Sequence, residues 1–312
     1  MPKRHESVLG KEVLQYLNLK EGSLIVDGTL GDGGHTELIL RNTGPDLRVL
    51  GIDRDLQAIE RSEERLAPFR NRVTLVHGNF SDIKNILKKA NIVSIDGFLL
   101  DLGVSSQQLD SPERGFSFSR NGPLDMRMDS MQKTTAADLL VKLSDQELIS
   151  VINGYGEERY SKRIVRAIRK AQGQNPVSTT IHLSDIISSV TRSPRPTKIH
   201  PATRTFQALR IAVNNELEHV KTALNDSLEV LRASARIIVI SFHSLEDRIV
   251  KNFFRDEEKG CVCPPRIPVC ACGRKVQLKI VTRRPSVPST EESQHNPRSS
   301  SAKLRVAERV YV

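Results

Sequence analysis

Tryptophan is absent from this sequence, and aromatic residues make up only 4% of its 312 residues. No apolar run approaches the roughly 20 residues that a membrane-spanning helix needs. The N-terminal residues, MPKRHESVLGKEV, lack the apolar stretch of a signal peptide. The four cysteines all fall within residues 261–272, so they are not spread along the chain as in a disulfide framework. These absences argue against a membrane protein or a disulfide-rich secreted protein, and we expect a cytoplasmic protein.

Positive charge predominates, because 47 lysines and arginines outnumber 37 aspartates and glutamates and give a formal net charge of +10. A basic surface attracts polyanions, so RNA, DNA and acidic membranes are candidate partners. A basic protein with no such partner is the plain alternative. The hydrophobic fraction of 38% is sufficient for a packed core, and the length suits one large domain or two ordinary ones.

Short apolar runs indicate strands that are buried on both faces, as in a parallel sheet covered by helices. Five such runs occur at residues 24–27, 48–53, 73–77, 95–101 and 236–241. Helical patterns separate the first four runs, at residues 36–41, 55–66 and 81–89. This strand–helix alternation predicts a doubly wound α/β fold with right-handed crossovers.

The alternation stops after the fourth strand. Short helices are expected there, at residues 135–143, 145–152, 157–171 and 184–190. We therefore predict a core formed by residues 1–106 and 205–312, with an inserted helical domain at 107–204. Apolar residues at spacings of three or four from Phe206 to Leu231 indicate one long helix leading back into the sheet. Two further strands are expected to pair as an antiparallel edge and to be joined by a loop, at residues 277–282 and 303–310.

The stretch D-G-T-L-G-D-G-G-H, residues 27–35, directly follows the first predicted strand. A glycine-rich turn between a strand and a helix is typical of nucleotide binding, because glycine lets the backbone approach a ligand closely. Asp53, at the end of the second strand, is placed to accept hydrogen bonds from ribose hydroxyls. The spacing is not the dinucleotide pattern G-x-G-x-x-G, which disfavours a dehydrogenase. Because Asp27 and Asp32 flank the turn, a cationic ligand such as S-adenosylmethionine suits it better than a pyrophosphate, and a tight turn without a ligand is the alternative.

Polar residues also end other strands. Asp101 ends the fourth strand, and Ser241-Phe-His-Ser244 follows the fifth. Ligands of open α/β sheets lie beyond the carboxyl ends of the strands, so Asp27, Asp53, Asp101 and this turn are expected at one crevice. Each of them alone is equally well explained as the N-cap of a helix.

Seven blocks stand out along the chain. They are D-G-T-L-G-D-G-G-H (27–35), D-L-G-V-S-S-Q-Q-L-D (101–110), R-G-F-S-F (114–118), P-L-D-M-R-M-D (123–129), Y-G-E-E-R (155–159), H-P-A-T-R-T-F-Q-A-L-R (200–210) and S-F-H-S-L-E-D-R-I-V-K (241–251). These blocks resemble the bacterial 16S rRNA cytosine-N4 methyltransferases, the family of ribosomal RNA small subunit methyltransferase H. The resemblance extends from His5 to Glu308. It implies a Rossmann-like class I S-adenosylmethionine methyltransferase sheet with an inserted helical domain.

This resemblance implies methyl transfer from S-adenosylmethionine to the exocyclic N4 of one decoding-centre cytidine, with 16S rRNA or the small ribosomal subunit as partner and no membrane. The family's cofactor contacts correspond to Gly33, Gly34, His35, Asp53, Phe80, Asp101 and Gln108. Two stretches depart from the family pattern: residues 298–301 read R-S-S-S where a second arginine is common, and residues 233–235 read A-S-A where a glycine-rich turn is common. The oligomeric state stays open, a homodimer included.

The cytosine N4 lone pair is delocalised into the ring, so an acceptor for an N4 hydrogen would help it attack a methyl group. Asp101 or the backbone carbonyl of Leu102 is expected to be that acceptor. Phe116 and Phe118 are candidates for stacking on a flipped base, and core packing is the alternative. His243 is a candidate contact with substrate or cofactor, although a helix-capping histidine is the commoner case.

Basic residues concentrate in the predicted helix 157–171 and in the stretch after it. They are Arg159, Lys162, Arg163, Arg166, Arg169, Lys170, Arg192, Arg195, Lys198 and Arg204. Such a surface can contact RNA phosphates or can simply be solvated. We favour RNA contact.

Two other functions fit parts of the sequence. An amino-methyltransferase acting on DNA or another RNA would usually show a [DNS]-P-P-[YFW] block after the fourth strand, where this chain has Asp101-Leu-Gly-Val. A non-catalytic RNA-binding assembly factor would not need the intact set of Gly33-Gly34-His35, Asp53 and Asp101.

The cysteines form the pattern C-x-C-x6-C-x-C in a loop that contains several prolines. Four thiolates, from Cys261, Cys263, Cys270 and Cys272, suit a structural Zn²⁺ ion, although the usual spacing is C-x2-C. Reduced thiols or a redox pair are the alternatives. We expect a zinc site here to be remote from methyl transfer.

Overall fold

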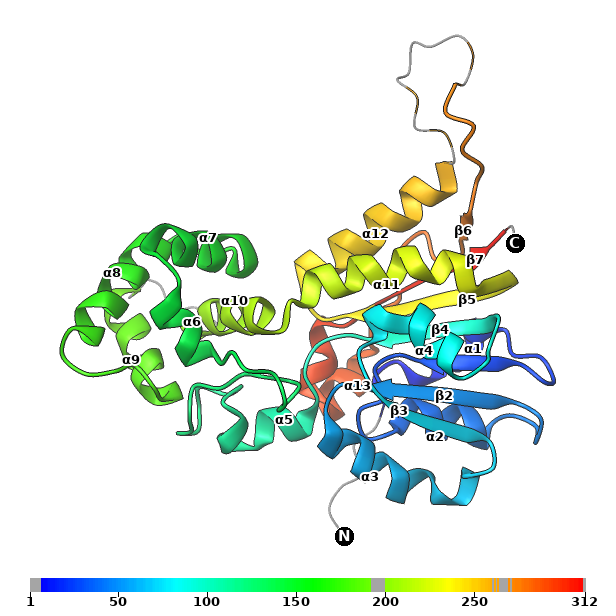
Figure 1. Cartoon of the computed structure of the whole chain (residues 1–312), viewed down its shortest axis with the longest axis horizontal. Helices are drawn as coiled ribbons and strands as arrows, with labels where there is room; N and C mark the ends of the chain where they lie inside the picture. The colour runs from blue at the N-terminus through cyan, green and yellow to red at the C-terminus, as the bar shows by residue number, and fades with distance from the viewer. Residues whose placement is uncertain are drawn as a thin grey trace. The chain divides into compact units, whose positions relative to one another are not determined.

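The computed structural model describes residues 7–191, 200–259, 261, 263, 269 and 271–310. The chain divides into two compact units. The sheet unit comprises Met1–Gly103 and Leu217–Val312, and the helical unit comprises Val104–Glu216. In Figure 1 the colour bar identifies the helical unit by its green segments.

The sheet unit is built on one sheet with the strand order β3-β2-β1-β4-β5-β7-β6 in the described part of the chain. The strands are β1 (Leu24–Asp27), β2 (Arg48–Asp53), β3 (Val73–His77), β4 (Ile95–Asp101), β5 (Leu231–Ser241), β6 (Leu278–Ile280) and β7 (Lys303–Arg309). The first five are parallel, and β7 pairs antiparallel with both β5 and β6. The predicted Rossmann-like sheet and its antiparallel edge are confirmed.

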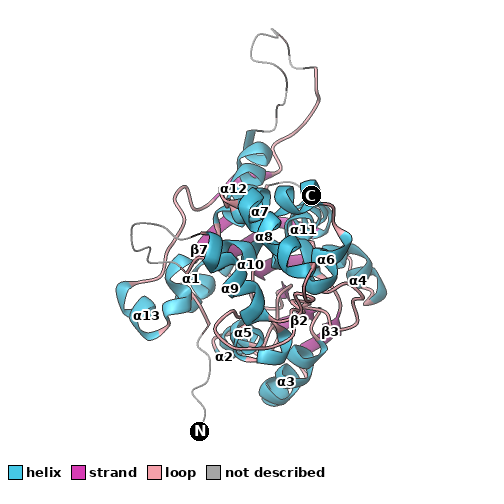
Figure 2. Cartoon of the chain, turned by 90° about the vertical axis from the view of Figure 1, so that its left-hand side faces the viewer, coloured by secondary structure: helices cyan, strands magenta, loops and turns pink. Residues whose placement is uncertain are grey.

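Helices cover both faces of this sheet (Figures 1 and 2). They are α1 (Gly10–Leu17), α2 (Gly34–Arg41), α3 (Leu56–Leu66), α4 (Ile83–Lys89), α11 (Glu216–Val230) and α12 (Ser244–Lys259). A short helix, α13 (Thr290–His295), has no buried residue. Successive strand residues point to opposite faces, so Phe98 of β4 packs with α4, α11 and α12, while its neighbour Leu99 packs with α1, α2 and α3. Burial on both faces explains why these strands are continuous apolar runs in the sequence.

The helical unit has a hydrophobic core of its own, which includes Leu140, Ile152 and Ile164. Its helices are α5 (Ser106–Asp110), α6 (Ala136–Lys142), α7 (Asp145–Gly156), α8 (Ser161–Gln172), α9 (Thr180–Val190) and α10 (Thr203–Asn214). Helices α5, α6 and α7 each begin with a capping box. In it the side chain of the N-cap serine or threonine accepts a hydrogen bond from the backbone amide of the third helical residue, whose side chain accepts one from the N-cap amide. These local signals set the helix starts that apolar spacing alone leaves uncertain.

Three expectations of secondary structure are corrected. The single long helix from Phe206 to Leu231 is two helices, α10 and α11, separated at Asn215, whose φ of +48° is left-handed. The fifth strand begins earlier than predicted, at Leu231, and passes through Ser234 at a φ of +66°. The segment between the last two strands contains α13 and a 3-10 helix, Pro297–Ser301, where only loop was predicted.

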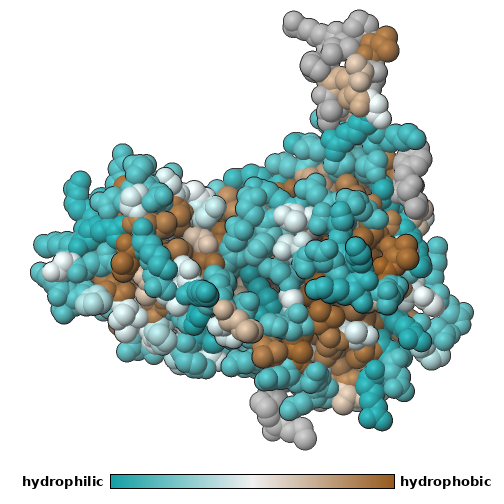
Figure 3. Space-filling view, viewed as in Figure 1, coloured by the Kyte–Doolittle hydropathy of each residue, from teal (hydrophilic) through white to brown (hydrophobic). Residues whose placement is uncertain are grey.

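The surface in Figure 3 is hydrophilic over most of the visible face, with apolar residues in smaller patches. None of the described helices is long and apolar enough to cross a membrane.

Candidate cofactor site

The glycines of the β1–α2 turn are required by the backbone itself. Gly31 and Gly33 have φ values of +53° and +75°, a region that favours glycine. A Cβ on Gly33 would also lie 3.1 Å from the Leu66 side chain of α3. The turn is therefore explained by conformation and packing, and the glycine content alone does not demonstrate a ligand.

Three acids end adjacent strands of the sheet unit. Asp27 ends β1, and β1 lies between β2, which ends at Asp53, and β4, which ends at Asp101. The turn is tied to both neighbours, because the Gly31 amide donates to Asp53 Oδ2 at 2.7 Å and the Asp101 amide donates to Thr29 Oγ1 at 2.6 Å. The carboxyl ends of these three strands lie side by side at one edge of the sheet, as predicted.

Asp27 forms hydrogen bonds within the protein. Its side chain is buried and accepts hydrogen bonds from Thr36 Oγ1 at 2.8 Å and from the Thr29 amide at 3.2 Å. Burial raises the pKa of Asp27 to about 6, although His35 and the Thr36 hydroxyl lower it. Asp32 likewise pairs with Arg61, at 2.8 Å. Both acids thus have partners within the protein, so their position beside the turn does not by itself indicate a cationic ligand, and the preference for one stays a prediction.

His35 and Asp101 have buried polar atoms for which the described part of the chain offers no hydrogen-bond partner. His35 lies in the first turn of α2 with 6% of its surface exposed, and its Nε2 is 3.4 Å from Asp101 Oδ2. Burial lowers the pKa of His35, but the carboxylates of Asp101 and Asp27 outweigh this effect and raise it overall. Both imidazole nitrogens and Asp101 Oδ1 are buried without a hydrogen-bond partner among the described atoms. Such atoms are rare in folded proteins, and a polar ligand would satisfy them.

Asp53 can still accept a ligand donor. Its Oδ2 accepts from Gly31 and its Oδ1 accepts from the Asp55 amide at 2.8 Å. Each carboxylate oxygen has two lone-pair sites, so one further donor to each is chemically possible. Burial raises the pKa of Asp53, and the two amides that it accepts oppose this.

Phe80 lies on the 3-10 helix Phe80–Asp82 and is mostly buried. Its ring meets the edge of His219 of α11 at a centroid distance of 6.5 Å. Asn79 Nδ2 lies 3.1 Å from His219 Nδ1, and burial, followed by the charge of Arg54, lowers the pKa of His219. His219 was not among the predicted site residues, because a single histidine on an otherwise ordinary helix gives no signal in the sequence.

Gln108 belongs to the helical unit. Its side chain completes the capping box of α5, where Oε1 accepts from the Ser105 amide at 3.1 Å. This local role fixes the side chain, and a contact with the cofactor stays a prediction.

His243 precedes α12 and serves its first turn. Its Nε2 lies 3.1 Å from Glu246 Oε1, and Glu246 Oε2 accepts from the Phe242 amide at 3.0 Å. These contacts favour the helix-capping interpretation over a direct substrate contact.

The two candidate stacking residues differ in exposure. Phe116 is buried in the core of the helical unit. Phe118 is partly exposed, and its ring stacks on His200 at 4.6 Å and meets Phe206 edge-on at 5.4 Å. Core packing explains Phe116, and Phe118 is the better candidate for base stacking.

Helix α8 presents the predicted basic surface. Ile164, Val165 and Ile168 are buried against the helical unit. Four basic residues of α8, and Arg159 just before it, are exposed and form no ion pair in the described part of the chain; those of α8 are Lys162, Arg163, Arg166 and Lys170. Arg169 differs, because its Nε donates to Asp145 at 2.6 Å. Arg192, Arg195 and Lys198 lie outside the described residues.

These features define a class. A parallel sheet of order β3-β2-β1-β4-β5, an antiparallel β7 beside β5, a glycine turn after β1 and an acid at the end of β2 form the class I S-adenosylmethionine-dependent methyltransferase fold. Within that class, the chain belongs to the MraW methylase family, whose sequence model matches residues 2–310.

Several curated relatives cover nearly the whole chain. It is 50% identical over 307 residues to "Ribosomal RNA small subunit methyltransferase H" of Trichlorobacter lovleyi, with 98% of each chain covered. The protein of the same name from Carboxydothermus hydrogenoformans is 49% identical over 307 residues, again with 98% of each covered. Among solved structures, an rRNA methylase from Streptococcus thermophilus overlaps with a TM-score of 0.41 and 10% identity, covering 96% of this chain and 93% of that one. That structural likeness is loose.

Proposed function

We propose that this chain transfers a methyl group from S-adenosylmethionine to the exocyclic N4 of a decoding-centre cytidine in 16S rRNA. Family membership and relatives named as small-subunit rRNA methyltransferases support this proposal. The observation that carries it is the pair of His35 and Asp101 beside the glycine turn, where both imidazole nitrogens and Asp101 Oδ1 are buried without a hydrogen-bond partner among the described atoms.

The residues at the strand ends fit this cofactor. Asp53 would accept the ribose hydroxyls, and the turn at Gly33, Gly34 and His35 would lie along the methionine part. Phe80 would contact the adenine. When bound, S-adenosylmethionine supplies an electrophilic methyl group on a sulfonium, whose positive charge suits the nearby carboxylate of Asp101.

Asp101 is also the proposed acceptor for an N4 hydrogen of the target cytosine. His35 Nε2 lies 3.4 Å from Asp101 Oδ2, and Oδ1 is buried without a hydrogen-bond partner among the described atoms, so Oδ1 can accept. The backbone carbonyl of Leu102 is the alternative acceptor. Holding N4 in line with the methyl group contributes much of the acceleration by itself. The proton that leaves N4 after transfer can pass to water.

The exposed cations of α8 are the proposed contact with the RNA backbone. Phosphate contacts position an RNA without reading its sequence, and they weaken as salt rises. Phe118 would supply a stacking surface for an unpaired base. The small ribosomal subunit or its 16S rRNA is the proposed partner.

Transfer of labelled methyl groups to a panel of acceptors tests this proposal. We expect label on small ribosomal subunits or 16S rRNA that lack the modification, and none on duplex DNA. Label on DNA would point to a DNA amino-methyltransferase instead. Binding of S-adenosylmethionine without any transfer would favour a non-catalytic assembly factor.

The variant Asp101→Asn tests the acceptor role. Transfer should fall by about 100-fold or more, as for the loss of one oriented polar group at a reacting centre. The matched control Asp46→Asn changes an exposed acid in the α2–β2 loop and should leave transfer unchanged. If Asp101→Asn weakens only cofactor binding, the acceptor role is wrong.

A further inference from the structure

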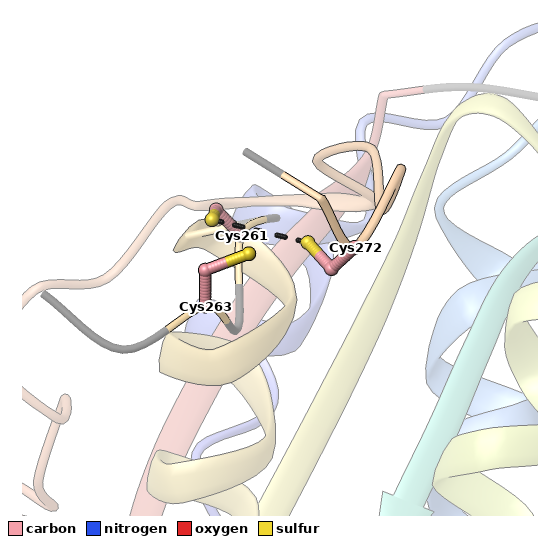
Figure 4. A group of neighbouring side chains, drawn as sticks. All are labelled: Cys261, Cys263 and Cys272. Atoms are coloured by element: carbon pink, nitrogen blue, oxygen red, sulfur yellow. Dashed lines mark hydrogen bonds between the residues drawn. The ribbon is translucent and has the colours of Figure 1, made fainter. Parts of the chain in front are cut away.

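Three cysteine thiols converge in the loop between α12 and β6. The Sγ atoms of Cys261, Cys263 and Cys272 all lie within 4.8 Å of one another. Figure 4 shows the three sulfur atoms directed toward one another. Cys270, the fourth cysteine of the predicted zinc set, lies outside the described residues.

The separation of the sulfur atoms fits a metal ion. Cys261 Sγ and Cys272 Sγ are 3.8 Å apart. A disulfide would bring them to about 2.05 Å. Two thiolates bound to one tetrahedral zinc at about 2.3 Å each are roughly 3.8 Å apart. The observed distance excludes a disulfide and matches two ligands of a shared ion as well as it matches a hydrogen bond between two thiols.

The described residues around the three thiols are mostly exposed to solvent. Cys261 and Cys272 are exposed, and 77% of the Val269 surface is exposed. At the base of the loop the Gln277 amide donates to the Glu257 carbonyl at 3.0 Å. Small segments without a core are commonly stabilised by a disulfide or a metal.

We propose that Cys261, Cys263 and Cys272 bind one Zn²⁺ ion. Thiolates select zinc and similar thiophilic ions and disfavour calcium and magnesium, which need oxygen ligands. Each cysteine binds as a thiolate and releases its proton to solvent. Three thiolates and one dication leave a net charge of −1. Residues 259–275 contain no acid, and because Arg274 already pairs with Glu257, the compensating positive charge in this stretch comes from Lys259, Arg266 and Lys275.

The ion has a structural role and is far from Asp101. Helix α12 starts after the carboxyl end of β5 and has 16 residues, a length of about 24 Å. Its end and the cysteines therefore lie toward the opposite edge of the sheet, where Leu278 of β6 pairs with Arg309 of β7. Zinc would stabilise the loop that connects α12 to β6. The proposal is independent of the methyl acceptor.

Metal analysis of the full-length protein tests the site. The protein is produced without a polyhistidine tag in zinc-supplemented medium, and its metal content is measured by mass spectrometry. We expect one Zn²⁺ per chain. Replacing Zn²⁺ with Co²⁺ should give the absorption bands of tetrahedral cobalt thiolate, and Cys261→Ser or Cys272→Ser should abolish them.

Ala271→Ser is the matched control, because it changes an exposed residue of the same loop and should retain the zinc. The cysteine variants should bind S-adenosylmethionine within about twofold of the parent affinity, which separates metal loss from misfolding. A parent protein without stoichiometric zinc would overturn the proposal. So would cysteine variants that keep their zinc.

Discussion

Replacing Asp27 with asparagine should change how the stability of the protein depends on pH. Burial raises the pKa of Asp27 to about 6 from its ordinary value of 3.8. Between these values the native protein holds a proton that the unfolded chain has released, so stability falls as pH rises through this window. The raised pKa of His35 has the same sign, because the stability from its protonation is present below its ordinary pKa and is lost as pH rises through the higher folded value.

The raised pKa of Asp27 determines how much the free energy of unfolding changes with pH. At about 1.4 kcal/mol per pKa unit, ionised Asp27 costs the native state about 3 kcal/mol. About half of that, roughly 1.5 kcal/mol, develops between pH 5 and pH 7.5. Asparagine is neutral throughout and keeps an oxygen for the Thr36 hydroxyl. The free energy of unfolding of Asp27→Asn minus that of the parent should therefore rise by about 1.5 kcal/mol across this range.

Urea denaturation of both proteins at pH 5, 6, 6.75 and 7.5, without cofactor, measures this difference. Because Asp27 and His35 titrate together, the curve reports the pair. Asp46→Asn, which removes an exposed acid, should run parallel to the parent at every pH. A difference for Asp27→Asn that stays flat, or falls as pH rises, would refute the reasoning.

Three further changes test other parts of the account. Asp53→Ala should weaken S-adenosylmethionine binding at least about tenfold by calorimetry, and unchanged affinity would remove its proposed ribose contact. Gly33→Ala should lower the free energy of unfolding by about 1–2 kcal/mol because of its left-handed φ, whereas Gly44→Ala, with open space at its Cβ, should change it little in urea denaturation. Arg163→Ala combined with Arg166→Ala should weaken RNA binding and reduce the salt slope by about 2, and an unchanged slope would leave α8 as a solvated face.

The parallel part of the sheet could be predicted because its strands are buried on both faces. The break between α10 and α11 could not. Leu209, Val213, Leu217 and Val220 keep a spacing of three or four across Asn215, so the apolar stripe continues although the backbone does not. Asparagine tolerates the left-handed conformation at low cost, so its presence alone is a weak signal.

The acids of the site could be predicted, but their partners could not. The carboxyl ends of adjacent parallel strands meet at one edge, which brings Asp27, Asp53 and Asp101 together. Residue types do not reveal that Thr36 satisfies Asp27 or that Arg61 pairs with Asp32. Those contacts depend on how α2 and α3 pack on the sheet, and they give both acids a structural role.

Nucleoside mass spectrometry of the reaction product tests the central claim most directly. Small ribosomal subunits that lack the modification are incubated with the protein and isotope-labelled S-adenosylmethionine, and their RNA is digested to nucleosides. The account predicts label in N4-methylcytidine. Label in any other nucleoside, or no label from a protein that binds the cofactor, would contradict it.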